Sequence, residues 1–104
     1  MSTKTIKVGL AEIEKQFGSL TFGRLLKSHR LGEELTQVEM AKQLKMSKQS
    51  LNDLENGRKI PSIRRAIEIA RRMGVLEELV VQLALQDQVS REKLKFTVRV
   101  SKAS

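Results

Sequence analysis

The fold is decided by the stretch T-Q-V-E-M-A-K-Q-L-K-M-S-K-Q-S-L-N-D-L-E-N-G, residues 36–57. Its apolar residues form two short groups with helical spacing: Met40, Ala41 and Leu44, then Leu51 and Leu54. Ser47 is a favourable N-cap between the groups, and Asn56-Gly57 is a stop signal after the second. The pattern predicts two short helices joined by a tight turn, with the small Ala41 where they approach each other.

The second helix carries polar side chains at its outward positions, which are Lys48, Gln49, Ser50, Asn52 and Asp53. Lysine, glutamine and asparagine are among the side chains that read base edges in a major groove. The chain has a net charge of +8, and residues 36–73 hold nine Lys and Arg against four Asp and Glu. Charge alone is equally typical of a solvated surface, but charge and motif together favour nucleic acid as the partner.

Residues 20–85 resemble the helix-turn-helix of the Cro and phage-repressor family of bacterial regulators. The matching positions are Gln37, Met40, Ala41, Leu44, the run Ser47-Lys48-Gln49-Ser50, Leu51 and the L-E-N-G of residues 54–57. The chain departs from the family at Lys45, where glycine is usual. A left-handed turn residue other than glycine costs about 1 kcal/mol, and we interpret Lys45 as a tolerated exception.

The resemblance implies a mainly α fold, a five-helix repressor-like helix-turn-helix bundle with its DNA-binding domain at residues 19–86. It implies a sequence-specific, repressor-like transcriptional regulator. We expect this protein to be cytoplasmic, because no apolar run has the length of a signal peptide or a membrane span, and to need no cofactor. Such a protein binds a near-palindromic operator in double-stranded DNA as a homodimer. The implied base contacts are Lys48, Gln49, Ser50 and Asn52. The implied phosphate contacts are Gln37, Ser47, Asn56, Arg58 and Lys59.

Arg30 and Glu55 stand where this family commonly has an ion pair. Arg30 follows Leu26 by four residues, so it borders the inward face of the helix that Ser19 or Thr21 would cap. A partly buried pair would tie that helix to the second helix of the motif, which carries the implied base contacts and which we call the recognition helix. The alternative is two independent surface charges.

Residues 76–85 are apolar on nearly all sides, which is seldom seen on an exposed helix of a monomer. A central core helix and a dimer interface both fit, and we favour an interface through Leu76, Leu79, Val80 and Leu83. Residues 87–104 are predicted to be a polar linker and a β-strand for dimer or partner contact. In that strand, four apolar residues alternate with polar ones: Leu94, Phe96, Val98 and Val100.

A lone strand needs a backbone partner. We consider three: residues 4–8, the same strand of a second subunit, or another protein. Residues 1–18 are predicted to be an extension with a short strand and a short helix. Both terminal segments support an alternative function, that of an antitoxin which neutralises a toxin protein and regulates its own operon. A phage repressor and a restriction-modification controller are both open within the first function.

The sequence indicates no enzyme. It has one His and no Cys, which argues against a zinc site or a thiol nucleophile, and we expect no metal. No apolar run reaches the length of a membrane span.

Overall fold

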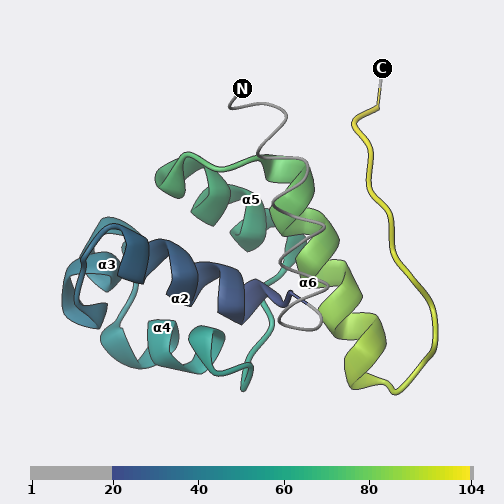
Figure 1. The fold of residues 1–104 in the computed structure, drawn as a ribbon, viewed down its shortest axis with the longest axis horizontal. Coiled ribbons are helices and arrows are strands. Elements are labelled where there is room, and N and C mark those ends of the chain that lie inside the picture. The colour runs from purple at the N-terminus through teal and green to yellow at the C-terminus, as the bar shows by residue number, and fades with distance from the viewer. Residues whose placement is uncertain (1–19, 104) are drawn as a thin grey trace.

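The computed structural model describes residues 20–103, which form five α-helices (Figure 1). They are α2 (Phe22–Gly32), α3 (Gln37–Gln43), α4 (Lys48–Glu55), α5 (Ile63–Met73) and α6 (Glu77–Arg91). Helix α2 packs against α4 and α6, α3 against α4, and α5 against α6. This confirms the mainly α helix-turn-helix bundle, whereas the strand and helix predicted for residues 1–18 lie outside the described residues. Within residues 20–103, no helix combines the length and apolar character needed to cross a bilayer.

Local sequence signals start and stop the helices. Helices α2 to α5 each begin after a hydroxyl N-cap that accepts a backbone N–H three residues on; these caps are Thr21, Thr36, Ser47 and Ser62. The Glu39 carboxylate accepts a hydrogen bond from the backbone N of Thr36, which completes a capping box. Lys45 adopts φ 55° in the turn before α4, so the predicted left-handed residue is present although it is not glycine.

The core is aliphatic apart from one phenylalanine, and it draws side chains from every described helix: Phe22, Leu26, Met40, Ala41, Leu44, Leu51, Leu54, Ala66, Ile69, Ala70, Val80, Leu83 and Ala84. Helix α2 comes close to the end of α4 at Gly23. A Cβ there would overlap the carbonyl oxygens of Leu54 and Glu55. Glycine at this position therefore sets the distance between α2 and the recognition helix.

Helix α6 differs from its prediction in two ways. It continues to Arg91, so residues 87–91 are helical and do not form a polar linker. Val80 and Leu83 are 0% and 5% exposed within this chain, which corrects their assignment to an interface with a partner. The apolar run there is wide because α6 packs against both α2 and α5. Leu76, 64% exposed, remains on the surface, and Leu79 is partly buried against the core.

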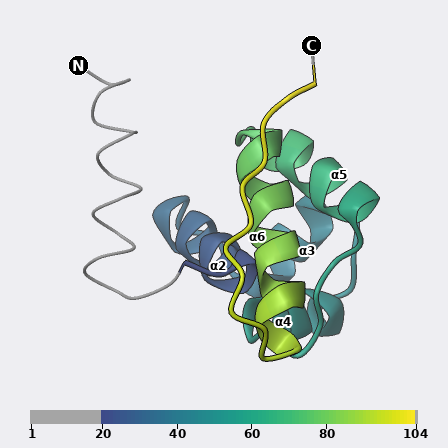
Figure 2. The same cartoon turned by 90° about the vertical axis from the view of Figure 1, so that its right-hand side faces the viewer.

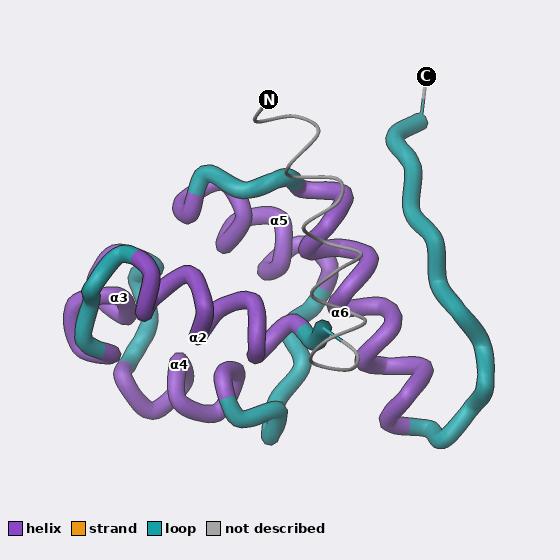
Figure 3. The backbone as a smooth tube through the Cα atoms, in the orientation of Figure 1, coloured by secondary structure: helices purple, strands orange, loops and turns teal. Residues whose placement is uncertain are grey.

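The predicted C-terminal strand is absent. Residues 94–103 form an extended segment that runs along α6 in Figures 1 and 2 and is drawn as loop in Figure 3. Gln86 donates to Phe96 O (2.9 Å) and accepts from Val98 N (2.7 Å). Gln82 accepts from Val100 N (3.0 Å). The alternation correctly indicated an extended backbone. The groups that bond one edge of this backbone are side-chain amides of α6, and not the backbone of a neighbouring strand.

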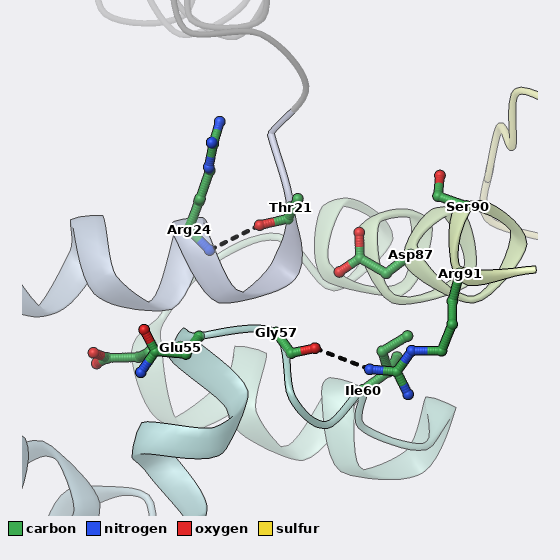
Figure 4. Close-up of a pocket in the computed structure, with 9 residues that line it drawn as sticks. Thr21, Arg24, Glu55, Gly57, Ile60, Asp87, Ser90 and Arg91 are labelled. Atoms are coloured by element: carbon green, nitrogen blue, oxygen red, sulfur yellow. Dashed lines mark hydrogen bonds between the residues drawn. The ribbon is translucent and has the colours of Figure 1, made fainter. Parts of the chain in front are cut away.

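A single carboxylate joins the start of α2 to α6. Asp87 Oδ2 accepts from the backbone N of Phe22 at 3.0 Å, and the two residues are 65 positions apart. Burial raises the pKa of Asp87 above the ordinary aspartate value, although the Phe22 N–H opposes that shift. Figure 4 shows Asp87 at a pocket of about 450 Å³ that Thr21 and Arg91 also line. There Arg91 donates to Gly57 O, so α6 also contacts the segment after α4.

A bidentate ion pair holds α2 against α4. Arg30 Nε donates to Glu55 Oε2 at 2.7 Å and Arg30 Nη2 to Glu55 Oε1 at 3.1 Å. The Arg30 and Glu55 side chains are 12% and 2% exposed, and the pair raises the pKa of Arg30 above its ordinary value, chiefly through the hydrogen bond to Glu55. Arg30 Nη1 also donates to Leu35 O. Two independent surface charges are thereby excluded.

We expect the Arg30→Ala and Glu55→Ala variants to be non-additive. Each should lower the free energy of unfolding by about 3 kcal/mol, because it leaves a buried charge uncompensated. A double-mutant cycle measured by urea unfolding should give a coupling above about 0.5 kcal/mol. The exposed pair Arg65 and Glu68 on α5 is the control, with a coupling of about 0.3 kcal/mol. Strict additivity at Arg30 and Glu55 would contradict a structural pair.

We also expect Asp87→Asn and Asp87→Ala to differ. The asparagine keeps an acceptor for Phe22 N and removes the buried charge, so it should be at least as stable as the wild type at pH 7. The alanine leaves the N–H unpaired and should cost about 1 kcal/mol or more. The raised pKa of Asp87 means that the folded state binds the proton more tightly than the unfolded state. The wild type should therefore lose stability relative to the asparagine variant as pH rises above about 4. Urea unfolding across pH measures this, and a relative gain by the asparagine variant on acidification would contradict it.

Candidate nucleic-acid interface

The tight turn between α3 and α4 places the recognition helix. Apolar side chains before and after the turn are buried in one shared core. They are Met40, Ala41 and Leu44 before the turn, and Leu51 and Leu54 after it. Met46 N donates to Ala41 O at 2.9 Å, which closes the turn over the end of α3. The apolar side of α4 is therefore fully used, and its polar side faces outward.

The predicted base-reading residues lie together on the outward side of α4. Lys48 and Gln49 are exposed, and Ser50 and Asn52 are partly exposed. Ser47 acts as the N-cap of α4: its hydroxyl accepts from Ser50 N and donates to Ser50 Oγ, both at 3.0 Å. That hydroxyl is thus occupied within the chain, although the helix end that it caps is exposed.

Asp53 is the exception among the residues predicted to point outward, because it is only 9% exposed. Gln49 Nε2 donates to its Oδ1 at 3.0 Å, one helical turn away. Arg58 Nε donates to the same oxygen at 2.9 Å. Lys59 Nζ lies 3.9 Å from Oδ2. The bond from Arg58 is the main cause that holds the pKa of Asp53 below its ordinary value, so it is a carboxylate at neutral pH.

The ion pair beneath α4 and the residues on its surface belong to one hydrogen-bonded chain. Gln37 Nε2 donates to Glu55 Oε1 at 3.1 Å, next to Arg30. Asn52 Nδ2 reaches Gln37 Oε1 at 3.5 Å. Arg58 Nη2 donates to Asn52 Oδ1, and its Nε joins Asp53 as described above. We call these residues the α4 network: Arg30, Glu55, Gln37, Asn52, Arg58, Asp53 and Gln49.

The structure brings most of the predicted phosphate-contacting residues to the same region. Gln37 lies in the α4 network, whereas the Arg58 and Lys59 side chains are 54% and 69% exposed after the end of α4. Asn56 is exposed, and its side chain donates to Asn52 O at 2.9 Å, so it also closes the last turn of α4. Arg58 and Lys59 are therefore the two basic side chains among the predicted phosphate contacts, and both are more than half exposed.

Two features of the interface escaped prediction from sequence. The first is the burial of Asp53. Its spacing of four residues from Gln49 places the two side chains next to each other on a helix and could have indicated their contact. The second is Arg65, which lines a shallow pocket of about 200 Å³ together with Ser50 and Lys59. The first turn of α5 therefore lies beside the recognition helix. The N-cap Ser62 placed Arg65 in that first turn, but nothing local indicated which side it would face.

Comparison with known proteins agrees with this geometry. A family model described as Helix-turn-helix matches residues 26–80, 55 of the 104 residues. A relative is the "ImmF control region 10 kDa protein" of Bacillus phage phi105, 48% identical over 48 residues, which are 46% of this chain. The chain spans about half the length of this relative, 53%. No solved structure matches the chain significantly.

The matched residues run from α2 into α6 and contain the whole α3–turn–α4 unit with its caps. On this basis the chain belongs to the helix-turn-helix family of the Cro and phage-repressor type.

Proposed function

We propose that this protein is a sequence-specific, repressor-like transcriptional regulator that reads the DNA major groove with α4. The observation that carries the proposal is the outward side of α4, where Lys48 and Gln49 are exposed on a helix fixed to α2 by the Arg30–Glu55 pair. Side chains of these types recognise base edges. The name of the phage relative, a control region protein, also supports a regulatory role.

Phosphate contacts would position α4 in the groove. Arg58 and Lys59 follow α4 directly and are more than half exposed. Gln37 and Ser47 lie at the N-terminal ends of helices, where backbone N–H groups can add to a phosphate contact, and Asn56 would contribute its exposed side chain. Such contacts carry little sequence information, so base discrimination would come from Lys48, Gln49, Ser50 and Asn52. A DNA partner would place the protein in the cytoplasm, and no step of this function requires a catalytic group or a cofactor.

A homodimer on a near-palindromic operator is the form that we propose for the DNA complex. Half-sites would lie about 34 Å apart, so that two copies of α4 enter successive major grooves. Support comes from large apolar side chains that are exposed in a single chain: Leu76, Leu94 and Phe96, at 64%, 50% and 66%. Val98 and Val100 are partly exposed beside them along the C-terminal segment.

An antitoxin remains a second candidate because of the backbone of the C-terminal segment. Lys95, Thr97 and Arg99 form no backbone hydrogen bond within residues 20–103, whereas Phe96, Val98 and Val100 are bonded to α6. An extended segment with one open edge can pair with a strand of another protein. A toxin protein is one such partner, and a second copy of this chain is another.

The test of the DNA-binding proposal is Gln49→Ala. We expect it to weaken binding to the protein's own operator by about 1–3 kcal/mol per half-site, the value of one good base contact. Binding to random DNA should change little. Titrations with operator and random DNA at one salt concentration measure both, and Gln88→Ala, an exposed glutamine on α6, is the control. Equal losses on both DNAs would show that Gln49 reads no base.

The test of the dimer is removal of residues 95–104, which leaves α6 and its C-terminal cap intact, including the bond from Leu94 N to Val89 O. The truncated chain should dissociate at a higher concentration than the full chain and bind a palindromic operator less tightly, even though the recognition helix is unchanged. Analytical ultracentrifugation and operator titration measure these effects. The Gln82→Ala/Gln86→Ala variant is the companion, because it releases the segment from α6 without deleting it. Unchanged dimerisation and affinity would assign the segment to another partner and favour the antitoxin.

A further inference from the structure

We propose that Asp53 is a positioning residue that sets Gln49 to read adenine in preference to guanine. The inference rests on the proposed DNA-binding function and adds the identity of a base to it. Its basis is the bond from Gln49 Nε2 to Asp53 Oδ1 (3.0 Å) on the outward side of α4. Asp53 itself is 9% exposed, so it acts through its neighbour and does not face the groove.

The chemistry of the two groups determines which way the Gln49 amide points. A carboxylate only accepts hydrogen bonds, whereas an amide has a donating nitrogen and an accepting oxygen. The nitrogen of Gln49 must therefore face Asp53, and one of its two N–H groups is used there. The carbonyl oxygen Oε1 and a single N–H are left for DNA.

One acceptor and one donor match adenine, which presents the N6 donor beside the N7 acceptor in the major groove. Guanine presents two acceptors, O6 and N7. To satisfy both, Gln49 would have to give up its bond to Asp53, and otherwise its carbonyl oxygen would oppose an acceptor. The orientation imposed by Asp53 therefore favours adenine.

Asp53 is held in place from its other side. Arg58 Nε donates to the same Oδ1 (2.9 Å), and Lys59 Nζ lies 3.9 Å from Oδ2. Arg58 also bonds Asn52, which leads through Gln37 to the buried Glu55. Two cations keep the carboxylate charged and fixed, so it presents an acceptor, and never a donor, to Gln49.

The experiment is selection of binding sites from random DNA by the full chain. Gln49→Ala first identifies the position in each half-site that Gln49 reads, because the preference there is lost. In the wild type we expect adenine over guanine at that position by about tenfold, the scale of one base contact. In Asp53→Ala no acceptor faces Gln49, so its amide can adopt either orientation, and the preference should fall below about threefold. A merely structural role of Asp53 would weaken binding without changing the preferred base.

Glu77→Ala is the matched control. It also removes one carboxylate that pairs with an arginine, Arg71, but at the start of α6, and it should leave the selected base unchanged. Thermal unfolding shows whether Asp53→Ala is folded, and Asp53→Ser serves in the same comparison if it is not. A wild type that selects no sequence would overturn the proposed function. A wild type that selects guanine at the Gln49 position, or an unchanged adenine preference in a folded Asp53 variant, would overturn this inference alone.

Discussion

The buried ion pair between Arg30 and Glu55 is the interaction on which the rest of the structure depends. The Glu55 carboxylate is almost fully shielded from solvent, and its two oxygens accept three N–H groups, two from Arg30 and one from Gln37. Burial of a charge is costly, so such a pair adds little net stability over apolar side chains of similar size. Its contribution is geometric, since it joins α2, the loop at Leu35, α3 and α4 at one point.

The same ion pair connects the buried contact between α2 and α4 to the polar side chains on the surface of α4. From Glu55 the hydrogen bonds continue through Gln37, Asn52 and Arg58 to Asp53 and Gln49. A carboxylate on a surface suited to a polyanion would ordinarily oppose binding. Here Asp53 is covered by Gln49 and Arg58. Its negative charge is compensated within the chain by Arg58 and Lys59. What faces outward is polar or basic.

Features that depend on a few neighbouring residues could be predicted from the sequence. The hydroxyl of Ser47, the turn at Lys45 and the apolar spacing of α3 and α4 determine local backbone, and each was found where it was expected. The Arg30–Glu55 contact followed from family resemblance, since nothing local joins residues 25 positions apart. Features that depend on distant partners were missed. The alternation of residues 94–100 indicated an extended chain, but it held no information that Gln82 and Gln86 would bind it.

The α4 network also bears on what DNA binding costs. A long side chain that becomes ordered at an interface loses about 0.5–1.5 kcal/mol of rotamer entropy. Gln49, Asn52 and Arg58 already have hydrogen-bonded partners in the free chain, so much of that loss is incurred on folding instead of on binding. Gln49 need not break its bond to Asp53, because an amide has more hydrogen-bonding groups than one acceptor can use. Lys48 has no such partner within residues 20–103, and its ammonium is free to adjust to base or phosphate. The outward side of α4 thus combines a side chain that is ordered in the free chain, Gln49, with an adaptable one, Lys48, and the order of Gln49 comes from a carboxylate that is itself buried.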